Sequence, residues 1–292
     1  NFNIPNGVKS LDGYSFCNCS NLTSINIPES VTYIGIGAFY LCTNLKSIAI
    51  PDSVTKIENI TFTGCSSLTS ISIPESVTYI GLDAFKDCTS LTSIYIPDSV
   101  TLTGLSGTFS GCTSLTNVKL PDVIYIISTN TFAGCSSLLN IIIPDSVTSI
   151  KECAFEGCKS LTNIAIPESV TKIKTWAFKD CTSLKSIAIN NPDCEISNAK
   201  DTIPETAVIY GYKNSTAQTY AESFNRKFIS LEEIGDISGN GEIDLYDAIE
   251  IAKAIMGLRT FTAEEMIIAD FNKDGTVDLY DAIEIARTLL PK

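Results

Sequence analysis

Two acidic stretches near the end of the chain carry the residues best suited to chemistry. Each has twelve residues with glycine at the sixth place: DISGNGEIDLYD at 236–247 and DFNKDGTVDLYD at 270–281. Oxygen-bearing side chains stand at places 1, 3, 5 and 12, place 7 can supply a carbonyl oxygen, and the glycine permits a sharp turn. Calcium prefers hard oxygen ligands in this number and order. The pattern therefore predicts one Ca²⁺ ion in each loop, two in all.

The places within each loop define the predicted ligands. In the first loop they are Asp236, Ser238, Asn240, the carbonyl of Glu242 and Asp247, with Asp244 at place 9, where water often intervenes. In the second loop they are Asp270, Asn272, Asp274, the carbonyl of Thr276 and Asp281, with Asp278 at place 9. Two metal-free acidic turns are the alternative, but they would have to produce this pattern twice by chance. The second loop holds more carboxylates, so we predict tighter calcium binding there.

The rest of the composition excludes several other kinds of chemistry. Histidine is absent, which removes Ser-His-Asp and Cys-His nucleophile pairs and the commonest zinc ligand. The net charge is −13, and nucleic acids or anionic membrane surfaces need a cationic patch. No apolar run approaches the ~20 residues that span a bilayer, so no membrane insertion is expected. We predict no catalytic residue.

A helix is expected after each loop, because the nonapeptide DLYDAIEIA occurs at 244–252 and again at 278–286. Neither loop is preceded by a clear helix, although Thr262 and Glu265 form a capping box for a short linking helix. The acidic excess also gathers here. Residues 231–292 are therefore predicted to form a small all-α unit with two calcium loop–helix motifs.

Upstream of this unit the chain repeats every 23 residues, with one interval of 24. The repeat is marked by cysteines at Cys19, Cys42, Cys65, Cys88, Cys112, Cys135, Cys158 and Cys181, each with phenylalanine three residues before and leucine three after. Within each repeat, C-x-x-L-x-x-I-x-I-P predicts a short strand that the proline ends. So strict a period indicates stacked coils, with one parallel sheet on one face and irregular or short helical turns on the other.

The coils are predicted to form a solenoid over residues 1–190, closed by a C-terminal cap over 191–230. In the cap we expect a strand at 208–210, a helix near 216–224 and a closing strand. The one-residue insertion within 101–109 predicts a local bulge. The first residues already fit the middle of a repeat, so we expect further residues upstream in the natural protein.

The cysteine ladder leaves two interpretations open. Coils stack about 4.8 Å apart, within the range of Cα separations that disulfides span, so distance does not exclude bridges. Side chains stacked in parallel are poorly aimed at one another, which favours reduced thiols that fill space beneath the phenylalanines.

These two parts resemble known families. The repeats are similar to the BspA-like class of bacterial leucine-rich repeats, and the duplicated loop–helix units resemble a type I dockerin. The resemblance implies a leucine-rich-repeat solenoid and an extracellular, cellulosome-associated or cell-surface protein whose dockerin binds a cohesin module of a scaffoldin. It also implies that the cohesin contacts are Leu245, Tyr246, Lys253, Leu279, Tyr280 and Arg287. Packing between the two helices is the alternative for the leucines, and the near-identical copies suggest two binding orientations.

The solenoid would be the part that binds an unknown macromolecular ligand. On its strand face only Tyr95, Lys119 and Ile142 stand out from small polar residues, and they share one position in successive coils, although ordinary surface variation also explains them. Trp176 is expected to pack in the interior. The predicted function is non-catalytic protein interaction, with an adhesin or an inhibitor-like binder of a host, plant or protease surface as the alternative. A polysaccharide-degrading enzyme is less favoured, because the acids after each proline lie in regular rows.

Overall fold

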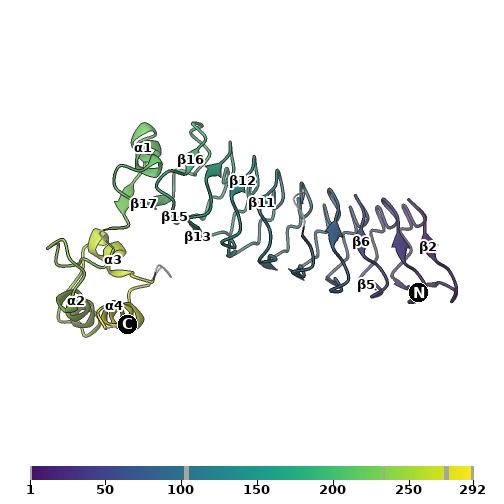
Figure 1. Cartoon of the computed structure of the whole chain (residues 1–292), viewed down its shortest axis with the longest axis horizontal. Helices are drawn as coiled ribbons and strands as arrows, with labels where there is room; N and C mark the ends of the chain where they lie inside the picture. The colour runs from purple at the N-terminus through teal and green to yellow at the C-terminus, as the bar shows by residue number, and fades with distance from the viewer. Residues whose placement is uncertain (1, 102–104, 233, 273–275, 291–292) are drawn as a thin grey trace.

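The computed structural model describes residues 2–101, 105–232, 234–272 and 276–290. Figure 1 shows a long stack of coils that ends in a cap and a small helical unit at the C-terminal end. The predicted fold class, a leucine-rich-repeat solenoid followed by a small all-α unit, is confirmed. The bulge predicted within 101–109 falls partly on residues 102–104, which lie outside the described residues.

The first face of the solenoid carries short parallel strands, one from almost every coil. They are β1 (Phe2–Asn3), β3 (Ser24–Asn26), β5 (Ser47–Ala49), β7 (Ser70–Ser72), β9 (Ser93–Tyr95), β10 (Asn117–Lys119), β13 (Asn163–Ile166), β15 (Ser186–Ile189), β17 (Val208–Gly211) and β18 (Phe228–Ser230). Neighbouring strands pair one repeat apart, so that Ile25 lies opposite Ile48. The prediction of one continuous sheet is wrong: the ladder divides into three stretches, because residues 139–144 form no strand and β7 does not pair with β9.

A second row of two-residue strands lies where each coil turns after its proline. These are β2 (Ser10–Leu11), β4 (Tyr33–Ile34), β6 (Lys56–Ile57), β8 (Tyr79–Ile80), β11 (Ile126–Ile127), β12 (Ser149–Ile150), β14 (Lys172–Ile173) and β16 (Glu195–Ile196). Sequence reasoning missed this row. Its signal is the V-T-x-I segment, in which the isoleucine points into the core and its neighbour points outward.

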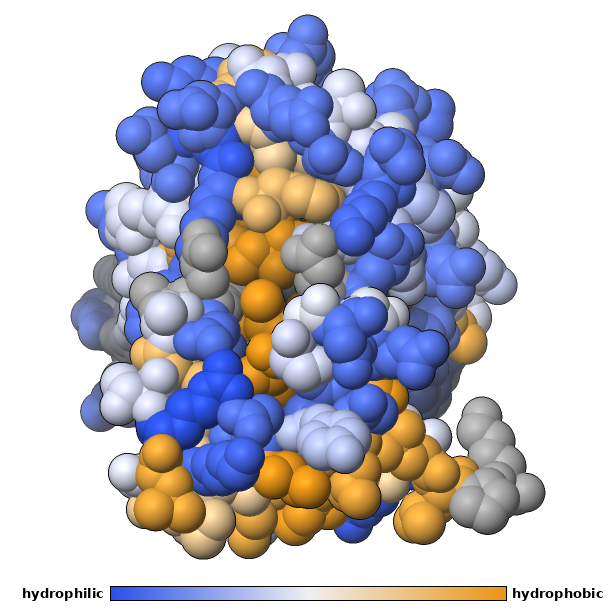
Figure 2. All heavy atoms as spheres, turned by 90° about the vertical axis from the view of Figure 1, so that its left-hand side faces the viewer, coloured by the Kyte–Doolittle hydropathy of each residue, from blue (hydrophilic) through white to orange (hydrophobic). Residues whose placement is uncertain are grey.

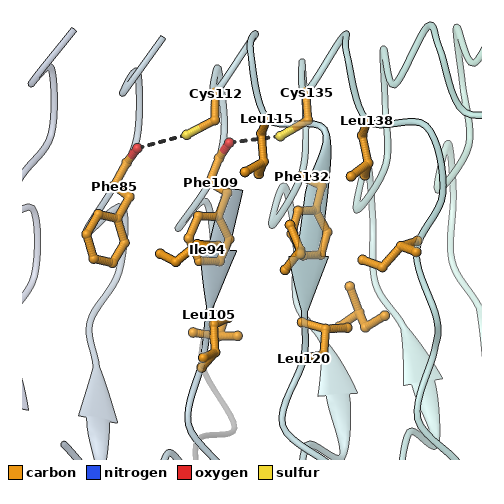
Figure 3. Close-up of a cluster of buried hydrophobic side chains, with 14 of the residues drawn as sticks. Phe85, Ile94, Leu105, Phe109, Cys112, Leu115, Leu120, Phe132, Cys135 and Leu138 are labelled. Carbon is orange, nitrogen blue, oxygen red and sulfur yellow. Dashed lines mark hydrogen bonds between the residues drawn. The ribbon is translucent and has the colours of Figure 1, made fainter. Parts of the chain in front are cut away.

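The core is a column of stacked phenylalanine rings. From Phe16 to Phe178, successive ring centroids are 5.2 to 5.7 Å apart and nearly parallel. Seven ladder thiols, from Cys42 to Cys181, each donate to the carbonyl oxygen of the phenylalanine in the preceding coil, at 3.0 to 3.2 Å. Figure 3 shows two of these bonds. The thiols therefore satisfy buried carbonyl groups as well as filling space.

All eleven cysteines are unpaired, and the seven bonded ladder cysteines are buried, whereas Cys19 in the first coil is only partly covered. Burial raises the pKa of the Cys42 thiol to about 11 and that of Cys112 to about 12. Loss of solvation disfavours the thiolate form, and this is the largest cause for both residues. These thiols are protonated at neutral pH and poorly suited to act as nucleophiles.

The residue two places before each core phenylalanine has left-handed backbone geometry. Glycine, asparagine or aspartate takes this place in several coils, but Ile60 (φ 50°) and Trp176 (φ 61°) take it in others. The expectation that Trp176 packs in the interior is wrong. Its side chain is 45% exposed, because this position lies on the outer turn of the coil, and Lys179 lies over its ring.

The solenoid ends in β17, helix α1 (Thr216–Ser223) and β18. Ser215 caps the start of α1, and the buried Tyr220 donates its hydroxyl to the carbonyls of Ala199 and Lys200. Helices α2 (Leu245–Ile255), α3 (Ala263–Ala269) and α4 (Leu279–Thr288) form the last unit around a separate small core. The two cores share no residue among those described.

Candidate functional site

The first predicted calcium loop folds around two carboxylates, one from each end. Asp236 accepts hydrogen bonds from the backbone N–H groups of Asn240 (3.0 Å) and Gly241 (2.8 Å) and from the Ser238 hydroxyl (3.2 Å). The fully buried Asp247 accepts from the Ser238 N–H at 2.9 Å. The side-chain amide of Asn240 donates to Asp244 at 3.3 Å. Five of the six predicted ligand residues are thus linked by direct hydrogen bonds.

The sixth residue of that set, Glu242, was predicted to use its carbonyl. Its N–H donates to the Asn240 side-chain oxygen at 2.7 Å, and its own side chain is exposed. The loop therefore holds this residue by its backbone and leaves its carboxylate outside the ligand set.

The second loop has the same closing arrangement. Asp281 is fully buried and accepts from the N–H of Asn272 (3.0 Å) and of Asp278 (2.9 Å). Thr276 is exposed, and Asp274 lies outside the described residues. Helix α3 ends directly at Asp270, so the second loop does follow a helix, contrary to the sequence-based expectation. The capping box of Thr262 and Glu265 that predicted this linking helix is confirmed.

The start of the second loop lies against the solenoid. Asp270 and Tyr210 of β17 line the same small cavity of about 130 Å³. Burial raises the pKa of Tyr210 to about 12, and the negative charge of Asp270 adds to the shift. The helical unit therefore contacts the C-terminal end of the sheet face.

The donors in both loops fit calcium. Asp247 and Asp281 are buried carboxylates, and among the described residues neither has a basic side chain within ion-pair distance. A buried anion held only by N–H groups is costly unless a cation also approaches it. No group of three or more acidic, cysteine or histidine side chains within the described ranges is already gathered for a metal. The predicted ligand sets combine carboxylates with hydroxyl, amide and carbonyl oxygens, which calcium accepts and zinc seldom does.

The carboxylates at places 9 and 12 also start the helices. Asp244 accepts from the N–H of Tyr246 at 2.7 Å, while Asp247 accepts from the N–H of Asp244 at 2.8 Å, which completes a capping box for α2. Asp278 and Asp281 repeat this arrangement at α4. Loop closure and helix initiation therefore use the same side chains, so ordering of the loop orders the first turn of the helix.

The first two residues of each helix are exposed to nearly the same extent in both copies. The exposed fractions are 58% for Leu245 and 57% for Leu279, and 70% for Tyr246 and 68% for Tyr280. The core between the helices is formed by other residues, including Ala248, Ile251, Ala282 and Ile285. Packing between the helices thus does not account for the leucines, and the unit carries an unoccupied apolar surface.

Sequence reasoning missed two members of this surface. Ile249 and Ile283 lie one helical turn after the leucines and are 40% and 37% exposed. The i, i+4 spacing was the available signal. Figure 2, which faces the C-terminal end, shows a band of hydrophobic residues along the lower edge, where Figure 1 places α2 and α4.

The two copies differ in their charged neighbours. Lys253 pairs with Glu250 at 2.7 Å, and Arg259 bonds both Glu250 and Glu265. These partners, Lys253 first, lower the pKa of Glu250. The corresponding Arg287 of α4 is exposed, and no ion pair is found for it within the described part of the chain. One copy therefore presents a paired lysine and the other an unpaired arginine.

The three predicted residues of the solenoid patch do lie together on the sheet face. Lys119 lies opposite Tyr95 in the β9–β10 pair, with its Nζ 5.3 Å from the centre of the tyrosine ring. Tyr95 is 46% and Ile142 86% exposed. Ile142 and Lys119 line one groove of about 330 Å³.

This geometry defines a solenoid of the bacterial leucine-rich-repeat kind, joined to a unit built from two acidic loop–helix motifs. The chain belongs to the BspA type leucine rich repeat family, whose sequence model matches residues 1–106 and 105–200 in six copies. The type I dockerin domain model matches residues 234–290. Dockerins of this type bind calcium and attach proteins to cohesins of cellulosomes.

A solved structure of a similar protein agrees with the fold, and a second shows similarity in sequence. A leucine-rich repeat protein from Bacteroides ovatus is 29% identical, with a TM-score of 0.62 over 79% of this chain and 69% of that one. A leucine rich cell surface protein from Faecalibacterium prausnitzii is 26% identical over 78% of this chain and 86% of that one, with a TM-score of 0.45. No curated protein matches the chain. Within the described ranges, no helix has the length and hydropathy needed to cross a bilayer.

Proposed function

We propose that this protein is a non-catalytic interaction protein that calcium-dependent dockerin–cohesin binding attaches to a cellulosome scaffold, outside the cell. The solenoid then displays a binding surface for a second macromolecule. The observation that carries the proposal is the matched pair of exposed Leu-Tyr anchors, each placed on the first turn of a helix by the carboxylates of its own loop. An apolar anchor with a polar tip is typical of interface hot spots.

Calcium would be held, one ion per loop, by the twelve residues named from the sequence. Bound calcium supplies a positive charge that offsets the repulsion between the loop carboxylates. Asp247 and Asp281 hold the N–H groups at the start of each loop and at the entry to each helix, so their position sets where the Leu-Tyr anchors point. A unit with so small a core is expected to depend on metal for its stability.

The proposal is tested by calorimetric titration of the intact chain against a panel of type I cohesins, with calcium and then with EDTA. We expect one-to-one binding that chelation abolishes. The double variant L245A/Y246A, the double variant L279A/Y280A and the variant carrying all four substitutions separate the two anchors. The control Y125A removes an exposed tyrosine of the solenoid.

Each double variant should keep binding through the other copy, and the quadruple variant should lose it. If either double variant alone abolishes binding, two equivalent orientations are excluded while the docking role stands. If no cohesin binds the calcium-loaded chain, the docking role itself is refuted.

The order of calcium binding is a further prediction. The second loop has four carboxylates and the first three, so we expect the second to fill first. Substitution D281N should therefore remove the tighter calorimetric phase and D247N the weaker one. The opposite assignment would contradict the argument from ligand charge.

A further inference from the structure

The sheet face of the solenoid is interrupted at one coil. The ladder is paired at β9–β10 and resumes at β13–β15, but residues 139–144 between them form no strand. Among the described residues, no backbone hydrogen bond joins 117–120 to 139–143, and on the other side only the Thr162 N–H reaches Leu139, at 3.4 Å. The backbone N–H and C=O groups of residues 140–143 therefore have no backbone hydrogen-bond partner among the described residues.

The same coil carries the least polar surface of the sheet face. Ile142 and Leu139 are 86% and 53% exposed, at positions where the next coil has Ala165 and Thr162. Their inward neighbours Ile141 and Ile143 are buried, so this coil still packs against the core. The interruption opens a groove of about 330 Å³ between this coil and β10.

The polar residues along the groove indicate which charge and which hydrogen-bonding groups a ligand should have. Asn117 and Asn140, one repeat apart, both line it. Asp98 already accepts the Lys119 ammonium group (3.8 Å) and the Asp122 N–H (3.0 Å). The carboxylate of Asp122 is exposed on the rim and, in the described part of the chain, has no basic partner of its own.

We propose that this groove, defined by Leu139, Ile142, Asn117, Asn140 and Asp122, binds an extended polypeptide segment in which apolar residues alternate with lysine or arginine. Unpaired backbone groups and side-chain amides match the N–H and C=O groups of an extended peptide. Ile142 and Leu139 offer apolar area that an apolar side chain would cover. The exposed carboxylate of Asp122 on the rim favours a basic partner over an acidic one. The inference deepens the proposed display role of the solenoid and is independent of cohesin docking.

Three fluorescein-labelled probes test the proposal by anisotropy on the full chain with calcium. They are a short peptide with alternating leucine and lysine, the same peptide with glutamate for lysine, and a linear β-1,4-linked glucose oligomer. We expect binding of the basic peptide that weakens with salt, and at least tenfold weaker binding of the other two.

Variants that introduce residue types found at these positions in other coils locate the site without disturbing the fold. L139T/I142S should weaken the basic peptide about tenfold or more, the effect expected for loss of one buried aliphatic side chain. D122N should weaken it severalfold, whereas the matched control D52N, at the same turn position in a distant coil, should not.

Equal binding of the acidic and basic peptides, tighter binding of the glucan, or unchanged binding by L139T/I142S would each overturn the proposal. Titration of a cohesin against the same preparations separates this result from the docking role. Lost peptide binding with intact cohesin binding refutes the groove alone.

Discussion

Alkaline pH should destabilise this solenoid through its buried thiols. Desolvation raises the pKa of Cys65, Cys88, Cys135 and Cys158 above the ordinary value of 9.0, and that of Cys112 to about 12. In the unfolded chain the same thiols ionise near pH 9. The stability that they contribute is therefore complete below about pH 9 and is lost as the pH rises towards the folded-state values.

The size of the effect follows from proton linkage. Between pH 9 and pH 10, each thiol that ionises only in the unfolded chain lowers the free energy of unfolding by about 1 kcal/mol. Five such thiols together lower it by about 5 kcal/mol, a large fraction of the ~5–15 kcal/mol typical of a folded domain. Urea unfolding followed by circular dichroism, under reducing conditions, measures this change.

A double variant, C88A/C112A, separates the effect of thiol ionisation on stability from the effect of other groups that titrate at alkaline pH. It should be less stable at pH 7, because two carbonyls lose their thiol donors and two small cavities form. Between pH 9 and pH 10, however, it should lose about 2 kcal/mol less stability than the parent chain. Tyrosine and lysine titrations are common to both proteins and cancel. An unchanged pH slope would refute the assignment of alkaline instability to the ladder.

Three substitutions test other parts of the packing. F109A interrupts the ring column and should cost about 3–5 kcal/mol of unfolding free energy in a denaturant melt. I60N relieves a β-branched residue with φ near 50° and should stabilise by about 1 kcal/mol, whereas the reverse change N130I, at the same place three coils away, should destabilise. S149A removes a buried hydroxyl that has no hydrogen-bond partner and should raise stability by about 1 kcal/mol, and a loss instead would mean that this hydroxyl is solvated.

The stacking of coils could be predicted from sequence because the same phenylalanine, cysteine and leucine recur in every repeat. The thiol-to-carbonyl bonds could not, since the donor and acceptor lie 26 or 27 residues apart and depend on how far one coil is offset from the next. The residues proposed as calcium ligands could be named from the sequence because each set lies within twelve consecutive residues. Glu265 and Thr262 were readable for the same reason, as a capping box within one turn.

Features that depend on the match between neighbouring coils were not predictable. Residues 139–144 have the same sequence pattern as the strands of other repeats, with Ile141 and Ile143 buried. They nevertheless form no strand, because their backbone makes no hydrogen bonds to β10 among the described residues. Trp176 was expected to pack because it stands just before the Ala-Phe position of the repeat, but its place in the coil has left-handed geometry on an outer turn. Ile249 and Ile283 were missed because their exposure depends on which face of each helix packs against the other helix. Hydrophobicity alone does not say which face of a helix has a partner.

The coil-to-coil register has a consequence for how such a chain can change length. Where strands pair, the partners are one repeat apart, and each core phenylalanine stacks on the equivalent ring of the next coil. A whole repeat can therefore be removed from or added to the middle of the stack while every remaining coil keeps equivalent neighbours. Such a change moves the two ends of the solenoid by about one strand spacing of ~4.8 Å. Recombination between near-identical repeats would thus adjust the reach of the molecule in uniform steps and leave the cap and the helical unit untouched.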